Sequence, residues 1–330
     1  MHWKLKALAY TVLSDMPFGT EIHYQLQKNV TKTLPRSDIG FERALRQARK
    51  HVNGFCAYQG QNLSDSIWFE FGTGWDLAVQ LFLYCLGVQR QITVDVTKLL
   101  RRELVNDLVL RIQRMDENDF KRIPEVLIGR DLERELEADY GITYTAPMDA
   151  RNTQLDADGV DMITSTLTVQ HIPRQVLVEI LTECHRILKP GGLLSIFANY
   201  QDHYAHTDQT ISCYNFLRYS DRMWRLYNCP QLYQNRLRHA DYISLFKACG
   251  FEILEVSGEN ESGLDENALA AIPIDSRFQG YSLQELAITK GHFLLRPVQK
   301  GTYRSGAGNV TDGLADNANP GISIESADEG

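Results

Sequence analysis

One carboxylate and two glycines fall within five residues, and a second carboxylate follows twenty-one residues later. These residues are Glu70, Gly72, Gly74 and Asp95. Glycine allows the backbone to approach a ligand closely, and a carboxylate at the end of a strand can accept hydrogen bonds from both hydroxyls of a ribose. The residue types and their spacing therefore favour a site for a ribose-containing cofactor.

The segments around these residues have the pattern of an open α/β sheet. The apolar run 67–69 predicts a buried strand, the apolar residues of 77–85 recur at helical spacing, and 91–94 predicts the next strand. A strand, a glycine turn, a helix, a strand and an acid in this order form the layout of a nucleotide site. Because a Gly-x-Gly pair alone is usually an ordinary turn, the order of the elements gives the motif its weight.

The rest of the chain continues the alternation of strands and helices. Pro173 suits the first turn of a helix, whose apolar stripe is followed by the helix breakers Lys-Pro-Gly-Gly at 189–192. Further strands are predicted at 141–145, 159–165, 193–197, 252–256 and 292–296.

Several ordered features resemble the class I S-adenosylmethionine-dependent methyltransferase family. The acid-x-Gly-x-Gly pattern of residues 70–74 and the run Arg-Ile-Leu-Lys-Pro-Gly-Gly-Leu at 186–193 are similar to recurrent segments of that family, although Trp75-Asp76 stands where many members have a third glycine. The resemblance covers 65–297. It implies an α/β, Rossmann-like methyltransferase fold with a mostly parallel seven-stranded sheet and an antiparallel last strand.

The resemblance also implies S-adenosylmethionine as the cofactor. Gly72 and Gly74 would shape the turn beside its amino acid portion, Asp95 would hold the ribose, and Asp149 would accept from the adenine amine. A dinucleotide oxidoreductase is the less favoured enzyme class, because Asp76 at the helix start would repel a pyrophosphate. The expected cofactor-binding residues are Glu70, Gly72, Gly74, Asp95, Asp149 and Ala150.

Three histidines are candidates for the catalytic base. Methyl transfer from a sulfonium requires alignment of nucleophile, methyl carbon and sulfur, and a hydroxyl acceptor usually loses a proton. His171 follows the fourth predicted strand, and His203 and His206 follow the fifth. Asp202 could orient His203, as Asp208 could orient His206; the alternative is that these histidines are plain surface residues. We expect no metal at this cluster.

An insertion at 199–239 follows the fifth strand and is rich in aromatic residues. Guanidinium groups bind carboxylates and phosphates in a bidentate manner, and aromatic side chains with hydrogen-bonding groups suit sugars. The expected acceptor-binding residues are Tyr204, Tyr214, Arg236 and Arg238. The alternative is that the aromatics form the core of the insertion and the arginines form salt bridges that join it to the sheet.

Composition limits the remaining possibilities. The net charge of −8 provides no global basic field for nucleic acid, and the six cysteines lack paired or metal-ligand spacing, so we expect a cytoplasmic protein with reduced thiols. Residues 1–64 are predicted to form a helical extension, and 298–330 a disordered tail. The extension could be an interfacial membrane helix, but we favour a helix that covers the cleft or forms a homodimer contact.

The hypothesis from the sequence is an enzyme that transfers a methyl group from S-adenosylmethionine to a hydroxyl of a small molecule or glycan-type acceptor. The non-enzymatic alternative is a methyltransferase-like scaffold that binds a partner, because Trp75-Asp76 departs from the family pattern. Retention of the acids Glu70, Asp95 and Asp149 counts against a scaffold, which would need none of them.

Overall fold

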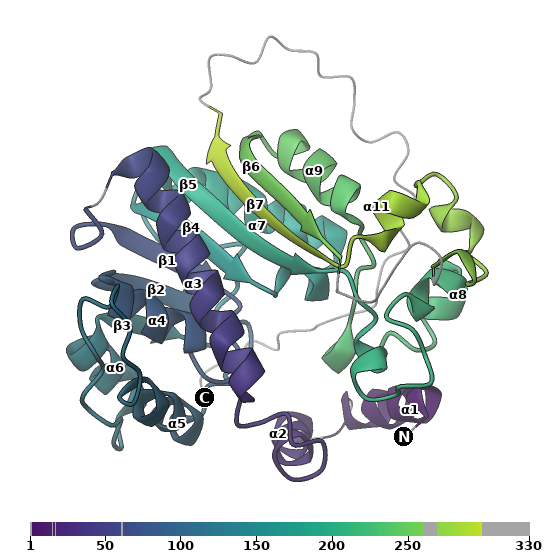
Figure 1. The fold of residues 1–330 in the computed structure, drawn as a ribbon, viewed down its shortest axis with the longest axis horizontal. Coiled ribbons are helices and arrows are strands. Elements are labelled where there is room, and N and C mark those ends of the chain that lie inside the picture. Colours follow the sequence, from purple (N-terminus) through teal and green to yellow (C-terminus); the bar gives the residue numbers. More distant parts are fainter. Residues whose placement is uncertain (1, 15, 17, 61, 261–268, 299–330) are drawn as a thin grey trace, which may run out of the picture. The chain divides into compact units, whose positions relative to one another are not determined.

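The computed structural model describes residues 2–14, 16, 18–60, 62–260 and 269–298. Its described part contains one seven-stranded sheet in the order β3-β2-β1-β4-β5-β7-β6 (Figure 1). The first five strands are parallel, and β7 is antiparallel to both of its neighbours. This topology confirms the predicted fold class. The strands are β1 (Ile67–Phe71), β2 (Arg90–Val94), β3 (Ile142–Thr145), β4 (Val160–Thr166), β5 (Leu188–Asn199), β6 (Phe251–Glu259) and β7 (Lys290–Pro297).

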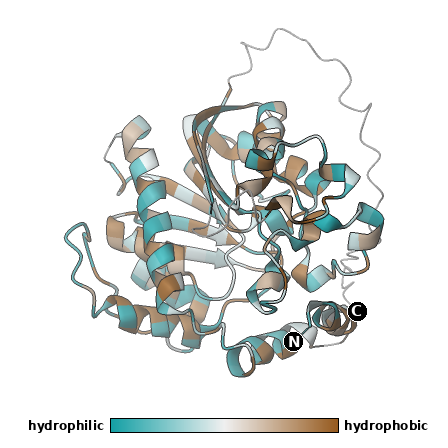
Figure 2. Ribbon diagram, turned by 45° about the vertical axis from the view of Figure 1, so that its right-hand side comes forward, coloured by the Kyte–Doolittle hydropathy of each residue, from teal (hydrophilic) through white to brown (hydrophobic). Residues whose placement is uncertain are grey.

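Helices cover both faces of the sheet, and Figure 2 shows hydrophilic and hydrophobic residues alternating along them. Successive strand residues point to opposite faces, so Trp68 packs with one group of helices and Phe69 with the other. The first group is α3 (Asp38–Gln59), α4 (Ala78–Leu86) and α5 (Arg102–Ile112), and the second is α7 (Arg174–Ile187) and α9 (His239–Ala248). The remaining helices are α1 (Trp3–Ser14), α2 (Gly19–Asn29), α6 (Leu132–Tyr140), α8 (Asp221–Trp224) and α11 (Leu283–Ala287), with 3₁₀ turns η1 (Val169–His171), η2 (His203–His206), η3 (Asn215–Arg218), η4 (Pro230–Leu232) and η5 (Ser276–Phe278).

The N-terminal extension is joined to the sheet by α3, which crosses its front face in Figure 1. This helix begins where the Ser37 hydroxyl accepts a hydrogen bond of 3.2 Å from the Gly40 backbone N–H. Its buried apolar residues recur three or four positions apart, which places them on one face: Phe41, Ala44, Leu45, Ala48, Val52 and Phe55.

The boundary between α7 and β5 differs from the sequence prediction. The helix ends at Ile187, and β5 begins immediately at Leu188 instead of after the glycines at 189–192. Leu188 pairs with Val160, but the register then shifts, and Gly191 takes a φ of +83° within the irregularity. The Lys-Pro-Gly-Gly segment is therefore accommodated as an irregularity within the strand, which glycine permits without steric cost.

The predicted disordered tail at 298–330 lies outside the described residues, except for Val298. None of the helices in the described part of the chain has the length and apolar content needed to cross a membrane.

Candidate functional site

The turn after β1 contains two glycines with different constraints. Gly72 and Gly74 have φ values of +85° and +73°, in the region that favours glycine. A Cβ atom at Gly72 would lie 2.2 Å from Cγ2 of Thr168, whereas a Cβ atom at Gly74 would meet nothing within 4 Å. Packing against Thr168 thus requires glycine at 72, and the backbone at 74 borders open space that a ligand can enter.

The carboxylate of Asp95 is held beside this turn. β1 and β2 pair in parallel, and one carboxylate oxygen of Asp95 accepts from the Gly74 backbone N–H at 3.0 Å. The other accepts from the Thr97 backbone N–H at 3.1 Å. Burial raises the pKa of Asp95 above its ordinary value, and these backbone donors oppose that rise. The two N–H groups fix the orientation of the carboxylate and leave lone pairs for further donors.

Glu70 is buried within β1, with 5% of its surface exposed. Its carboxylate accepts a hydrogen bond of 2.7 Å from the Thr164 hydroxyl on the neighbouring strand β4. Burial raises the pKa of Glu70 to about 7, despite this hydrogen bond. A positively charged ligand group nearby would favour the ionised form of this acid.

Asp149 lies in the loop after β3, and this loop is tied to Asp95 because the Met148 backbone N–H donates to the Asp95 carbonyl at 2.8 Å. The carboxylate of Asp149 accepts from Nε and Nη2 of Arg151 at 2.9 and 2.6 Å, and this pairing lowers the pKa of Asp149. Ala150 is half-buried and packs against the core. The sequence prediction did not include Arg151 as a partner of the acid.

The two residues in place of the third glycine bind the N-terminal extension. Trp75 stacks on Tyr24 of α2, with ring centroids 5.5 Å apart. The buried carboxylate of Asp76 accepts two hydrogen bonds of 2.8 Å from Arg36. The sequence analysis missed these contacts because no motif links the partners, which lie about forty residues or more apart in the chain.

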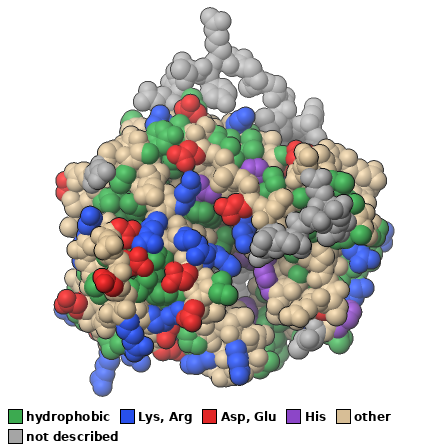
Figure 3. Space-filling model, viewed as in Figure 1, with side chains coloured by type: hydrophobic (Ala, Val, Ile, Leu, Met, Phe, Trp, Pro, Cys, Tyr) green, Lys and Arg blue, Asp and Glu red, His purple; other side chains and the backbone are tan. Residues whose placement is uncertain are grey.

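The three candidate histidines gather at the carboxyl ends of β4 and β5, as predicted from their positions in the chain. The ring centroids of His171 and His203 are 4.8 Å apart, and those of His203 and His206 are 5.5 Å apart. Figure 3 shows histidine side chains beside a hollow between α3 and the insertion. This edge of a parallel sheet is where ligands of open α/β folds bind.

Two of these histidines have distinct hydrogen-bonding states. Nδ1 of His171 lies 2.8 Å from the Tyr233 carbonyl oxygen. Because a carbonyl only accepts, Nδ1 carries the proton, and Nε2 of the neutral ring retains its lone pair. Among the described residues, Nε2 of His203 has no hydrogen-bond partner. Burial, followed by the neighbouring histidines and Lys6, lowers the pKa of His203 well below its ordinary value, which keeps this ring neutral.

The N-terminal helices connect the histidine cluster to the glycine turn. Nζ of Lys6 on α1 donates to the Thr207 hydroxyl at 3.0 Å, just after η2. The ring of Tyr10 meets the edge of His23 at 5.1 Å, and His23 in turn meets Trp75 at 6.1 Å. Residues of α1 and α2 therefore lie between the two halves of the candidate site. The sequence analysis expected a helix of the extension to cover the cleft or form a homodimer contact, but it named none of these contacts.

The expected orienting carboxylates are engaged elsewhere. Asp202 is fully buried and accepts from the Tyr204 backbone N–H at 2.9 Å and from the Asn215 amide at 2.8 Å. Asp208 accepts from the Trp3 backbone N–H at 2.8 Å and thereby holds the first turn of α1. These bonds correct the expectation that Asp202 orients His203, and they give Asp208 a structural role in attaching the extension.

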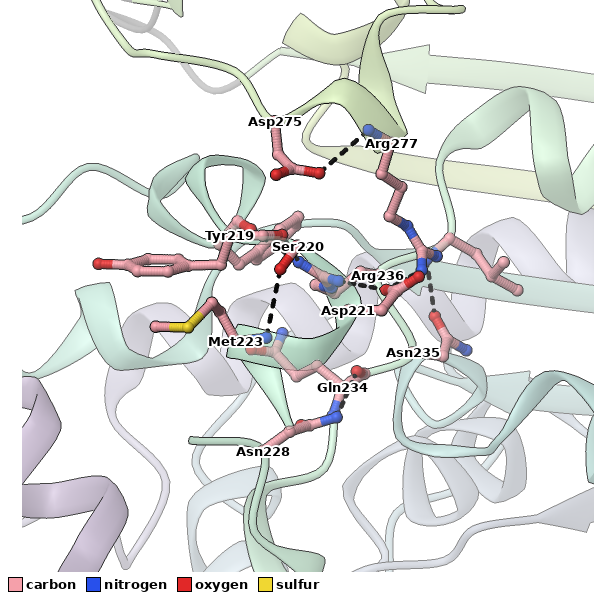
Figure 4. Close-up of polar contacts among 12 residues, drawn as sticks. Tyr219, Ser220, Asp221, Met223, Asn228, Gln234, Asn235, Arg236, Asp275 and Arg277 are labelled. Carbon is pink, nitrogen blue, oxygen red and sulfur yellow. Dashed lines mark hydrogen bonds and ion pairs between the residues drawn. The ribbon is translucent and has the colours of Figure 1, made fainter. Parts of the chain in front are cut away.

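The four residues expected to bind the acceptor are buried inside the insertion, with at most 4% of their surface exposed. The hydroxyls of Tyr204 and Tyr214 donate to backbone carbonyls at 2.5 and 2.9 Å. Arg236 donates to two carbonyls and pairs with Asp221, which also pairs with Arg277 (Figure 4).

Arg238 donates to the carbonyls of Tyr200, Leu286 and Ile288 at 2.7–2.8 Å. Its guanidinium is fully buried, and the three carbonyls belong to the start of the insertion and to the segment that contains the end of α11 and leads into β7. The expectation of acceptor contact at Tyr204, Tyr214, Arg236 and Arg238 is therefore corrected, because most of their polar atoms form hydrogen bonds within the protein; Nε of Arg238 is buried without a partner among the described residues.

Part of the chain matches a known protein family. A family model described as a methyltransferase domain matches residues 129–196. None of the curated proteins compared with the chain matches it.

Solved structures with a similar fold include geranyl diphosphate C-methyltransferase from Streptomyces coelicolor, with 12% identity, a TM-score of 0.46, and coverage of 81% of this chain and 86% of that one. A SAM-dependent methyltransferase from Methanosarcina mazei has 11% identity and a TM-score of 0.45, and the match covers 72% and 94% of the two chains. The [4+2]-cyclase SpnF has 13% identity and a TM-score of 0.46, with coverage of 80% and 85%. At these values the likenesses do not bear on function.

The sheet order and the glycine turn are those of the class I S-adenosylmethionine-dependent methyltransferase fold, and residues 129–196 of the chain match the methyltransferase-domain model. The cofactor of the chain is S-adenosylmethionine, which supplies an electrophilic methyl group when bound. The open space at Gly74 and the fixed carboxylate of Asp95 fit such a ligand.

Proposed function

We propose that this methyltransferase acts on a hydroxyl of a small molecule or glycan-type acceptor and that His171 removes the hydroxyl proton. The observation that carries the proposal is the fixed ring of His171, whose Nδ1 is held by the Tyr233 carbonyl at 2.8 Å. Nε2 is then the basic nitrogen, at the edge of the sheet where acceptors bind in this fold class.

We further propose that the cofactor is held by residues on the first three strands. The backbone around Gly72 and Gly74 would border the amino acid portion, Asp95 would accept from the ribose hydroxyls, and Asp149 with Ala150 would contact the adenine. Glu70 would supply negative charge beneath the turn. The hydrogen bonds from Gly74 and Thr97 to Asp95 support this assignment, because a carboxylate already oriented loses little freedom on binding.

In the proposed mechanism the histidine cluster prepares the acceptor oxygen. Nε2 of His171 accepts the hydroxyl proton while the oxygen attacks the methyl carbon, and the imidazolium that forms keeps its Nδ1 bond to Tyr233. His203 packs against His171 with centroids 4.8 Å apart and helps to set the angle of its ring. His206 is the third member of the cluster and packs against His203, with ring centroids 5.5 Å apart.

The test combines methyl transfer with binding. Protein supplied with S-adenosylmethionine carrying a ¹³C methyl group is incubated with pooled hydroxylated small molecules and oligosaccharides, and the chemical shift of the product methyl carbon identifies the bonded atom. The proposal expects an O-methyl shift and a decrease in turnover of about 10²–10⁴-fold for His171→Ala. S-adenosylhomocysteine affinity of this variant should equal that of the wild type. A product methyl group on nitrogen or carbon would refute the proposal.

A partner-binding scaffold without catalysis remains the second candidate, because Trp75 and Asp76 are both committed to the N-terminal extension. These contacts could have replaced a functional turn. Calorimetric titration with S-adenosylhomocysteine separates the two candidates, with NAD as the control ligand. Binding of the former alone supports the enzyme, and absence of binding supports the scaffold.

A further inference from the structure

Helix α1 exposes an apolar face although its opposite face is already buried. Trp3, Ala7 and Tyr10 are buried and face the rest of the domain. On the other side, Leu5, Leu8 and Val12 have 62%, 62% and 57% of their surface exposed. The spacing of these three residues places them along one stripe of the helix. A surface helix normally presents polar residues on its outer face, so this stripe needs a separate explanation.

The part of the insertion that packs against α1 carries further exposed apolar residues. Figure 1 shows α1 on the outer side of the insertion, below α8. Trp3 packs against Trp224 and Tyr227, with centroids 6.4 and 4.7 Å apart. The residues Met223 and Leu226 of the same turn are 44% and 66% exposed.

Exposed basic residues lie on the same two segments, α1 and the turn of the insertion that contains Met223 and Leu226. Lys4, Arg222 and Arg225 are exposed, and Lys4 lies over the ring of Tyr227 at 5.5 Å. Within the described residues, no carboxylate lies at ion-pair distance from any of these three cations. Their charge is therefore available to a partner, even though the whole chain has a net charge of −8.

We propose that this face docks on the surface of a bilayer that contains anionic phospholipids. Leu5, Leu8 and Val12 would enter the boundary between headgroups and acyl chains, and the three cations would contact lipid phosphates. A second copy of the chain fits less well, because a two-fold contact would bring each basic cluster against its own image. The inference is independent of the identity of the methyl acceptor.

The experiment is co-sedimentation of the full chain with vesicles of phosphatidylcholine, either alone or with about one third phosphatidylserine. The wild type should bind the anionic vesicles. The triple variant Leu5→Ser, Leu8→Ser, Val12→Ser should bind on the order of tenfold more weakly or worse, because the apolar side chains provide the insertion. A matched control replaces three exposed apolar residues elsewhere, Ile39→Ser, Leu110→Ser and Val256→Ser, and should retain binding.

A second set of variants tests the electrostatic contribution of Lys4, Arg222 and Arg225 to vesicle binding. Lys4→Glu, Arg222→Glu and Arg225→Glu together should abolish the preference for anionic over neutral vesicles. Melting temperatures near that of the wild type show that the variants are folded. The proposal is overturned if the wild type does not bind, if the serine triple variant binds as well as the wild type, or if sedimentation velocity shows a dimer that this variant dissociates.

Discussion

The proposed cofactor side and the proposed acceptor side of the site are built from different kinds of contact. On the cofactor side, Gly72, Gly74 and Asp95 follow adjacent parallel strands, and hydrogen bonds between neighbours fix them. On the acceptor side, the histidine cluster and the N-terminal helices come from segments more than one hundred residues apart. On the proposed cofactor side, Asp95 lies beside the open space at Gly74. In the insertion, by contrast, several polar side chains, including those of Arg236 and Arg238, are buried and form hydrogen bonds within the protein. A sequence motif therefore predicts the position of candidate residues only where short-range geometry fixes that position.

The largest effect is expected for the buried arginine of the insertion. Arg238→Ala removes donors to three carbonyls and should lower the free energy of unfolding by about 3–5 kcal/mol, because those acceptors stay buried without partners. Chemical denaturation measures the change. The exposed control Arg222→Ala should change stability by no more than about 0.5 kcal/mol. Normal stability of Arg238→Ala with loss of turnover would return this residue to the acceptor side.

Substitution of the two glycines of the turn should distinguish a role in packing, at Gly72, from a role in ligand binding, at Gly74. Gly72→Ala should cost about 2–4 kcal/mol of stability, because its methyl group collides with Thr168 and its φ is +85°. Gly74→Ala has open space and should cost only about 1–2 kcal/mol from its positive φ. It should nevertheless weaken S-adenosylhomocysteine binding in calorimetry. Equal stability losses in the two variants would contradict the distinction.

Glu70 should make stability depend on pH. Its pKa is raised from 4.5 to about 7, so the folded state keeps a proton that the unfolded chain releases as the pH rises through this interval. The contribution of Glu70 to the free energy of unfolding is therefore lost as the pH rises from 4.5 to about 7, and the loss above pH 7 amounts to about 3 kcal/mol. Glu70→Gln should exceed the wild type in stability at about pH 8, and the difference should vanish near pH 4. Parallel pH profiles of unfolding would show that burial does not perturb this acid.

The smallest effect is expected on cofactor affinity, from removal of the carboxylate proposed to bind the ribose. Asp95→Ala should weaken cofactor binding by about 1–3 kcal/mol, because ribose hydroxyls would lose a charged acceptor. Isothermal titration with S-adenosylhomocysteine gives the value. The exposed Asp116→Ala is the matched control and should leave affinity unchanged. Unaltered affinity in Asp95→Ala would overturn the ribose assignment and place this acid among the purely structural residues.

Much of the sheet was predictable because its signals are local. Apolar runs of strand length, separated by helical periodicity, specify the alternation of elements, and the glycine turn marks the end of β1. The predicted start of the fifth strand, at residue 193, was wrong. Pairing of Leu188 with Val160 begins β5 earlier and carries it through glycines that would otherwise end a helix and form a turn. Here hydrogen bonds to a neighbouring strand overrode a local preference.

The sequence by itself determined the fold class, the cofactor and the edge of the sheet at which the histidines meet. These follow from periodicity, from glycine conformation and from the rule that parallel strands end together. Only the tertiary structure decided that Arg236 and Arg238 are buried, that Asp76 binds Arg36, and that α1 keeps an exposed apolar face. Burial and pairing depend on which distant segments meet, and side chains of the same type can line a pocket or fill a core. That choice is made by packing over the whole domain, which no local pattern records.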